Sequence, residues 1–334
     1  MTIGQPRIEL ARLPTPLERL DRLSRAWGGP TLWVKRDDLT GFGLSGNKVR
    51  KLEYHLAAAI DAGADTVVTC GAAQSNHCRT TAIACARLGM RAVLLLRTPD
   101  GLDPGIPAGN HLLDILAGAD CRYVTPVGYR HRDEIMETLA AEVGAAGGRP
   151  WVIPEGASDA VGMWGFVAAM EELAAQLDGT LPGVPVTVWH AASSGATSAG
   201  LGWAVDGGTL DHRLVASSVG DSVGDLQRRI DSIWAEAALT TGAAQPRPAM
   251  ELVDDHIGLG YGQVTLEEWE TQLEVTRLTG LVLDPTYTGK AIHGLRVDIA
   301  AGRFTRDDHV VFWHTGGGFA PFAAEIPLAV LHRP

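Results

Sequence analysis

A lysine lies where a glycine-rich segment is expected to turn into a helix. Gly41, Gly43 and Gly46 precede Lys48, and apolar residues recur with helical spacing from Val49 onward, so the lysine falls near a helix start. Loss of water around its amine, together with neighbouring cations, would lower the lysine pKa, as an imine-forming lysine requires. From this stretch alone, an exposed lysine on an amphipathic helix is an equally good interpretation.

The same glycines match two nucleotide-binding patterns, G-x-G-x-x-G and, nearly, the phosphate-binding loop of nucleotide triphosphatases. Neither match fits its context. A dinucleotide loop needs an apolar strand running directly into its first glycine, whereas the candidate strand Thr31–Val34 is followed by the mostly polar residues 35–40. A phosphate-binding loop needs Ser or Thr after its lysine, and Val49 follows Lys48 here.

Two other segments place small and hydroxyl-bearing residues between an expected strand and an expected helix. Gly71–His77 follows the apolar run Val67–Cys70, and Ala191–Leu201 follows Val186–His190. Backbone N–H groups at a helix start bind anions, so the first segment suits a carboxylate and the second a phosphate dianion. The alternatives are an ordinary Ser or Asn helix cap in the first and a tight strand-to-helix turn in the second.

Two segments near the C-terminus carry further polar groups at expected strand ends. Leu283–Ala291 contains a proline followed by Thr286, Tyr287 and Thr288, and in Val310–Gly318 a threonine precedes three glycines. Taken alone, the tyrosine would be a core aromatic residue with a polar tip. The glycines would mark an ordinary strand terminus.

Composition indicates a compact α/β enzyme. The chain has 334 residues, a hydrophobic fraction of 46% and 40 glycines, which allows a large core and two domains. Its net charge of −11 argues against nucleic acid or an anionic membrane as a partner. Met1–Leu20 has no apolar segment typical of a signal peptide or membrane span, so we expect a cytoplasmic protein. The four cysteines lack C-x-x-C spacing, so we expect no metal site and no disulfide framework.

Short β-branched runs alternate with longer helical patterns along the whole chain. This alternation predicts a parallel sheet covered by helices on both faces. Besides Thr31–Val34, the expected strands are Thr66–Thr69, Ala92–Leu96, Arg122–Thr125, Trp151–Pro154, Val186–His190, Leu214–Ser218 and Val310–Trp313.

Three runs together resemble a known family: LPTPL at Leu13–Leu17, KRDD at Lys35–Asp38 and SGNKVRKLE at Ser45–Glu53. They are similar to the pyridoxal-phosphate enzymes that comprise D-cysteine desulfhydrase and 1-aminocyclopropane-1-carboxylate deaminase. The resemblance implies the α/β fold of the tryptophan synthase β-subunit group (fold type II), with two doubly wound open sheets and the cofactor in the interdomain cleft. The large domain would comprise residues 1–49 and 163–334 and the small domain residues 50–162, in a homodimer.

The resemblance also implies roles for individual residues. Lys48 would bind pyridoxal 5'-phosphate covalently and exchange the α-proton, Ser75 would act as an acid or base, and Tyr287 and Tyr261 would face the substrate. The cofactor would be held by Lys48, Asn47, Lys51, Ser194, Gly195, Ala196, Thr197, Thr288 and Thr315, with the Thr315 hydroxyl at the pyridine nitrogen. The substrate would be bound by Ser75, Asn76, His77, Trp164 and Tyr287.

The chain departs from the family pattern at several positions. The phosphate loop has Ala196 in place of a glycine and Ser198 in place of a histidine, and residues 318–322 replace the usual A-P-A-L-F. Glu155 and Asp159 fall where the family has other residues. If these two carboxylates face the pocket, they would disfavour an additional anionic group on the substrate.

The expected reaction is α,β-elimination from a small β-substituted amino acid, most simply D-cysteine, giving pyruvate, ammonia and hydrogen sulfide. A hydroxyl at the pyridine nitrogen makes the ring a weak electron sink, which favours loss of a β-substituent. Aminocyclopropane-carboxylate deamination is the second candidate, weakened because the deaminases carry Glu at the position of Thr288. Elimination or replacement on L-cysteate, β-chloroalanine or O-acetylserine is the third, and a nicotinamide oxidoreductase or a non-catalytic binding module is the alternative class.

Overall fold

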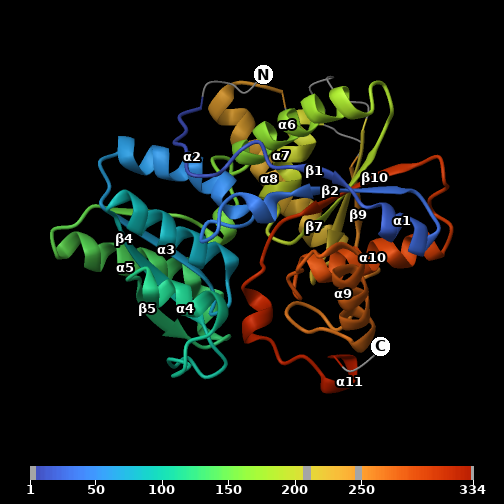
Figure 1. Cartoon of the computed structure of the whole chain (residues 1–334). Coiled ribbons are helices and arrows are strands. Elements are labelled where there is room, and N and C mark those ends of the chain that lie inside the picture. Colours follow the sequence, from blue (N-terminus) through green and yellow to red (C-terminus); the bar gives the residue numbers. More distant parts are fainter. Residues whose placement is uncertain (1–4, 206–211, 245–249, 332–334) are drawn as a thin grey trace.

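Two β-sheets lie side by side in the computed structural model, which describes residues 5–205, 212–244 and 250–331 (Figure 1). The larger sheet has the strand order β1-β2-β10-β7-β8-β9, and the smaller one β5-β4-β3-β6. All neighbouring strands are parallel except β1 and β2. The strands are β1 (Leu17–Arg19), β2 (Thr31–Arg36), β3 (Thr66–Ala72), β4 (Arg91–Arg97), β5 (Asp120–Val124), β6 (Pro150–Val152), β7 (Thr187–Ala192), β8 (Arg213–Ser218), β9 (Met250–Val253) and β10 (His309–His314).

Helices cover both faces of each sheet, which confirms the predicted doubly wound α/β architecture. Helices α6, α7 and α8 pack on one face of the larger sheet, and α1, α9 and α10 pack on the other. In the smaller sheet α2 and α3 cover one face and α5 the other. The helices are α1 (Asp21–Trp27), α2 (Lys48–Asp61), α3 (Asn76–Leu88), α4 (Gly109–Leu116), α5 (Arg132–Ala145), α6 (Trp164–Thr180), α7 (Ala196–Ala204), α8 (Val223–Thr241), α9 (Leu266–Thr279), α10 (Thr288–Ala300) and α11 (Leu328–Leu331).

Every strand predicted from the sequence is present within a few residues of its expected bounds. The sequence analysis missed β1 and β9, the two edge strands of the larger sheet, which have only 3 and 4 residues. All strands of the smaller sheet lie between Thr66 and Val152. The assignment of residues 50–162 to a separate small domain remains a prediction. In the described residues no helix combines the length and apolar character needed to cross a bilayer.

Two glycines allow α6 to contact α2 and α7 at backbone distance. A Cβ atom at Gly165 of α6 would overlap the carbonyl group of Arg50 in α2. A Cβ atom at Gly200 of α7 would overlap the carbonyl oxygen of Met163, just before α6. The absence of side chains at these points therefore sets the separation of three helices.

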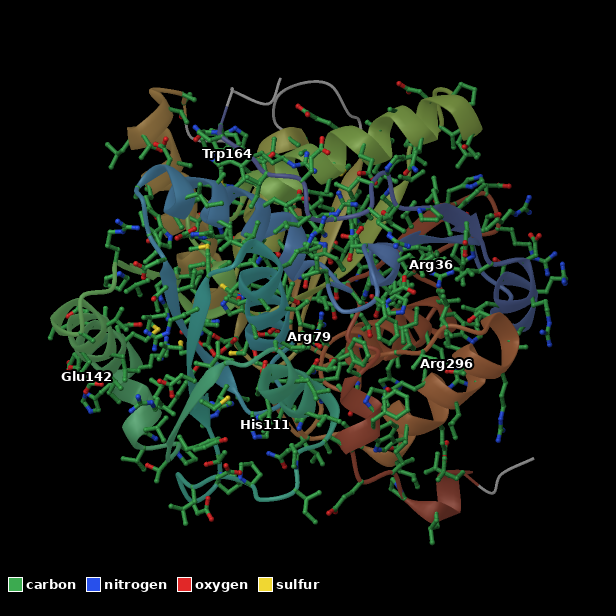
Figure 2. All side chains as sticks on the ribbon, turned by 60° about the vertical axis from the view of Figure 1, so that its left-hand side comes forward. Arg36, Arg79, His111, Glu142, Trp164 and Arg296 are labelled. Carbon is green, nitrogen blue, oxygen red and sulfur yellow. The ribbon has the colours of Figure 1, made fainter. Side chains whose placement is uncertain are left out.

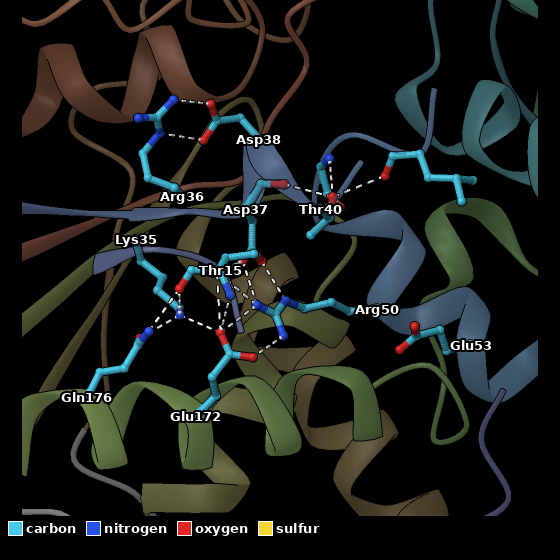
Figure 3. A network of polar contacts seen from close by, with 12 residues as sticks. Thr15, Lys35, Arg36, Asp37, Asp38, Thr40, Arg50, Glu53, Glu172 and Gln176 are labelled. Carbon is cyan, nitrogen blue, oxygen red and sulfur yellow. Dashed lines mark hydrogen bonds and ion pairs between the residues drawn. The ribbon is translucent and has the colours of Figure 1, made fainter. Parts of the chain in front are cut away.

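A buried network of charges joins β2, α2 and α6 (Figure 3). Arg50 of α2 donates to Asp37 over 2.8 and 2.9 Å and to Glu172 of α6 over 3.0 Å. Lys35 of β2 pairs with Glu172 and donates to the carbonyl oxygen of Thr15 over 2.7 Å. Burial opposes ionisation of Glu172, but the hydrogen bonds and positive charges of Arg50 and Lys35 outweigh it and lower its pKa to about 2.

Arg50→Met should destabilise the protein strongly. The variant leaves Asp37, which is 0% exposed, without its main cationic partner, and removal of one member of a buried pair costs about 3–5 kcal/mol. Urea unfolding followed by circular dichroism measures the loss. Arg122→Met is the matched control, because it breaks the exposed pair with Asp120 and should cost at most about 1 kcal/mol. Equal effects would show that the buried network contributes no more than a surface ion pair.

Candidate functional site

A cavity of about 800 Å³ opens where strands of both sheets end and helices α2, α3 and α7 begin. It gathers segments that are far apart in the sequence. The site residues predicted from the sequence that line it are Asn47, Lys48, Ser75, Asn76, His77, Ser194, Gly195, Thr197, Tyr261, Tyr287 and Thr315. The structure therefore brings most of the predicted site together.

Lys48 is the first residue of α2, as predicted, and its amine faces the cavity. Desolvation lowers the pKa of Lys48 to about 8, opposed by the negative charge of Glu155. The chain has only three other lysines, and each is engaged: Lys35 with Glu172, Lys51 with Gly156 and Ser158, and Lys290 with Glu268. In the part of the chain that the structure describes, no hydrogen bond or ion pair holds the Lys48 amine, so it is free to react.

The loop before Lys48 is fixed by very close backbone contacts. A Cβ atom at Gly46, where φ is +106°, would lie 2.9 Å from the carbonyl oxygen of Thr315, and a Cβ at Gly316 would overlap Gly46. Asn47 joins the loop to two other walls of the cavity: its N–H donates to the Thr315 carbonyl over 2.9 Å, and its side chain donates to the Thr197 hydroxyl over 3.3 Å. Lys48 is thus held beside both threonines.

Arg79 supports the same loop from the other sheet. It lies on α3, and its guanidinium donates to the carbonyl oxygens of Gly43 over 2.7 Å and Ser45 over 2.9 Å. Figure 2 shows Arg79 near the centre of the molecule, between the parts that carry the two sheets. The lysine loop is therefore connected to both halves of the structure.

The N-terminus of α7 lines the same cavity as the lysine and forms a nest of backbone N–H groups that could bind an anion. Gly195 adopts φ +102° and precedes the first turn, whose N–H groups have no partner within the helix. The Ser194 hydroxyl lies 2.6 Å from that of Ser158. A Cβ atom at Gly156 would lie 2.9 Å from the Ser194 hydroxyl and 3.2 Å from the Lys48 amine, so the glycine keeps space open between lysine and nest.

The segment that opens α3 combines helix capping with a cavity position. Ser75 accepts a hydrogen bond from the N–H of Cys78 over 3.2 Å, as an N-cap does, and also lines the cavity. The Asn76 amide donates to Asp284 over 2.8 Å. The structure is therefore compatible with Ser75 as a helix cap and with Ser75 as a carboxylate-binding residue. The second role remains a proposal.

His77 is held in one neutral tautomer. The Thr69 hydroxyl donates to the Ile153 carbonyl over 2.7 Å, so it must accept from His77 Nε2, which lies 2.8 Å away. Burial, followed by the charges of Lys48 and Lys51, keeps the His77 pKa well below its usual value. Its Nδ1 is buried and finds no hydrogen-bond partner among the described residues, so its lone pair is available.

Two tyrosines form a pair of neutral phenols on the cavity wall. The hydroxyls of Tyr261 and Tyr287 lie 2.5 Å apart. Burial raises the pKa of Tyr261 to about 12 and that of Tyr287 well above its usual value. Because one phenol donates to the other, the second O–H remains available to a ligand.

Four residues predicted for the site lie outside the cavity lining: Lys51, Ala196, Trp164 and Thr288. Lys51 and Ala196 are buried next to residues that line the cavity. The Trp164 ring packs edge-to-face on Trp203 with centroids 5.7 Å apart. The Thr288 hydroxyl is committed to the protein, since it accepts from the Asp284 N–H over 2.7 Å. Direct ligand contact by these four side chains remains a prediction.

Other lining residues escaped the sequence analysis, among them Arg97, Tyr129 and Arg132. Arg97 is the last residue of β4, and the carboxyl ends of parallel strands are where ligands bind in open α/β sheets. The position of Arg97 at the end of an expected strand was therefore a signal that the sequence contained. The positions of Tyr129 and Arg132 depend on the packing of a short turn, for which the sequence carries no comparable signal.

Comparison with known proteins gives a consistent result. The sequence profile described as "Pyridoxal-phosphate dependent enzyme" matches residues 8–316. A D-cysteine desulfhydrase of Salmonella paratyphi A is 38% identical over 327 residues, spanning 95% of this chain and 96% of the relative. One from Salmonella choleraesuis is 39% identical over 324 residues, with the same coverage. A crystal structure titled as an ACC deaminase homologue is 35% identical, has a TM-score of 0.84 and covers 96% of this chain and 94% of the other.

The Lys48 amine should become reactive at lower pH than an ordinary lysine. Only the unprotonated amine reacts with cyanate, so in cofactor-free protein the carbamylation rate of the Lys48 peptide, followed by mass spectrometry, should rise through a midpoint near pH 8. Glu155→Gln removes a charge that raises this pKa and should shift the midpoint further down. The urea-denatured chain is the control, with a midpoint near 10.5. A folded midpoint near 10.5 would contradict desolvation of the amine.

Proposed function

The chain belongs to the family of pyridoxal-phosphate dependent enzymes, and on that premise we propose that it catalyses α,β-elimination on a small β-substituted amino acid, with D-cysteine as the first substrate. The observation that carries the proposal is the Lys48 amine. It is unpartnered in the described residues, has a pKa of about 8 and lies between an anion nest and a row of hydroxyls. Ammonia, pyruvate and hydrogen sulfide would be the products.

The residues present fit the cofactor. Lys48 would bind it covalently, and the N–H groups and hydroxyls of Ser194, Gly195 and Thr197 would hold its phosphate. Thr315 would place its hydroxyl at the ring nitrogen. When bound, pyridoxal phosphate supplies the electron sink that makes the α-proton of an amino acid acidic.

Different side chains of the cavity would bind the substrate, remove its α-proton and protonate the leaving group. Ser75 and Asn76, at the start of α3, would bind the substrate carboxylate. The Lys48 amine, with a pKa of about 8, would take the α-proton near neutral pH, where a base with a matched pKa is effective. The free phenol of the Tyr261–Tyr287 pair, kept protonated by its raised pKa, would donate a proton to the departing sulfur.

Deamination of aminocyclopropane-carboxylate is the second candidate, because the printed title of the structural relative names an ACC deaminase homologue. The residue after Tyr287, which is Thr288, argues against this deamination. Thr288 carries no charge, and its hydroxyl is bonded to the backbone of Asp284. The Thr315 hydroxyl, proposed at the ring nitrogen in place of a carboxylate, suits loss of a β-substituent better than ring opening.

A substrate panel distinguishes the two reactions. D-cysteine should give pyruvate and sulfide far faster than aminocyclopropane-carboxylate gives 2-oxobutyrate, because elimination needs only a good leaving group on Cβ. Coupled dehydrogenase assays measure both oxoacids. Lys48→Ala should abolish both reactions and serves as the background control. Efficient 2-oxobutyrate formation by the unmodified enzyme would place deamination first.

Thr197→Asp should weaken cofactor binding before activity is considered. A carboxylate in the nest repels the phosphate, and at partly buried sites two like charges about 4 Å apart cost about 4 kcal/mol, so the dissociation constant should rise by several hundredfold. Absorbance of the bound cofactor after dialysis measures retention. Thr197→Val, which removes only the hydroxyl, should cost about tenfold. Unchanged retention in the aspartate variant would move the phosphate site elsewhere.

We further propose a cytoplasmic homodimer. The four cysteines are all free, as expected in a reducing compartment. The dimer follows from the family resemblance, and sedimentation equilibrium of the purified protein tests it.

A further inference from the structure

Asn110, the second residue of α4, has a fully buried side chain and lies behind the cavity wall. Helix α4 approaches the segment before α3 very closely, since a Cβ atom at Gly109 would lie 2.6 Å from Gln74 Oε1. The backbone N–H of Asn110 donates to that oxygen over 3.0 Å, and the Gln74 amide nitrogen donates to the carbonyl oxygen of Ala108 over 3.0 Å. The first turn of α4 is therefore bonded to the segment that leads into α3.

The partners of the Asn110 side chain leave only one orientation for its amide. Its Oδ1 lies 3.1 Å from Arg79 Nε, and a guanidinium can only donate. Its Nδ2 lies 3.0 Å from the backbone carbonyl oxygen of Gln74, which can only accept. The other N–H of Nδ2 is then available to Asn76 Oδ1, also at 3.0 Å. The oxygen and both N–H groups of this buried amide are thus assigned.

The orientation of the Asn110 amide decides that of Asn76, which lines the cavity. Because Asn110 donates, the Asn76 oxygen turns toward it. The Asn76 nitrogen then faces Asp284, whose Oδ2 accepts over 2.8 Å. Within the described residues one N–H of the Asn76 nitrogen is left without a partner, and such a donor suits an anionic group of a ligand.

We propose that Asn110 is a positioning residue: by donating to Asn76 Oδ1, it turns the Asn76 amide so that an N–H faces the carboxylate of an amino-acid substrate. The inference rests on the carboxylate-binding role proposed above for Asn76, and it explains how a residue outside the cavity enforces that role. Arg79 extends the arrangement, because its other two donors hold the loop before Lys48. One buried series of hydrogen bonds therefore connects the lysine loop with the expected carboxylate site.

Asn110→Asp tests the proposal with almost no change in side-chain size. The new carboxylate still accepts from Arg79, which keeps the contact between α3 and α4, but it cannot donate to Asn76. The Asn76 amide then lies between two carboxylates, and its nitrogen is drawn away from the ligand. The affinity for a ligand carboxylate should fall by about 10- to 100-fold, as expected for loss of a charge-assisted hydrogen bond.

The measurement titrates the holoenzyme with free alanine and with alaninamide, each as both enantiomers, and follows the absorbance of the bound cofactor. Neither ligand has a leaving group, so binding is observed without elimination, and only alanine carries a carboxylate. Asn110→Asp should weaken binding of alanine and leave that of alaninamide within a few-fold. Leu116→Asp is the matched control, because it adds the same charge to α4 at an exposed position, and it should leave the ratio of the two affinities unchanged.

A double-variant comparison shows whether the effect passes through Asn76. Asn76→Ala should weaken binding of alanine by a similar factor, and Asn110→Asp in that background should add nothing. Asn110→Ala, which removes the donor without adding a charge, should show a smaller loss of the same kind and replaces the aspartate variant if that variant does not fold.

Three results would overturn the positioning role: additive losses in the double variant, equal losses for alanine and alaninamide, or an unchanged ratio in both Asn110 variants. The proposed reaction fails separately. If the variants change the alanine-to-alaninamide ratio as expected while the unmodified enzyme turns over no β-substituted amino acid, the reaction is wrong and the positioning role stands.

Discussion

The ion pairs between Arg50 and the carboxylates of Asp37 and Glu172 hold together the segments beside the cavity. Arg50 lies two residues after Lys48, on the first turn of α2, and its partners come from the end of β2 and from α6. A charge buried in this way can be satisfied only in one arrangement of the three segments. The Lys48 amine, which has no bond of its own in the described residues, therefore takes its position from its neighbour in the helix.

Much of the fold could be read from the sequence because each central strand is a short β-branched run followed by a helical pattern. The edge strands β1 and β9 gave no such signal, since their sequences, LER and MELV, contain no β-branched run. Motifs predicted the helix starts at Lys48 and Ala196, and the structure places both segments at one cavity. Their roles remain predictions. Thr288 shows what a motif leaves open: its hydroxyl is bonded to Asp284, and its contact with the cofactor remains a prediction. Which of two hydrogen bonds a threonine makes depends on tertiary contacts.

Besides its arginines and carboxylates, the cavity holds three side chains that burial keeps neutral. Burial keeps both phenols of the Tyr261–Tyr287 pair protonated and His77 uncharged, while Glu155 is paired. Each phenol in such a site keeps its proton until a strong enough base forms next to it. In the proposed reaction, Lys48 would therefore act as the base without competition from these three side chains.

The contacts at Gly165 and Gly200 fix how closely α6 lies to its two neighbouring helices. Gly165 holds α6 against the helix that begins at Lys48, and Gly200 holds it against the helix whose first turn forms the anion nest. The distance between the reactive amine and the nest therefore depends on how α2 and α7 pack against α6. If the nest holds the phosphate as proposed, a carbonyl compound whose anionic end is too near or too far from its aldehyde could not reach both points. Gly165 and Gly200 would then select a ligand by its length without touching it.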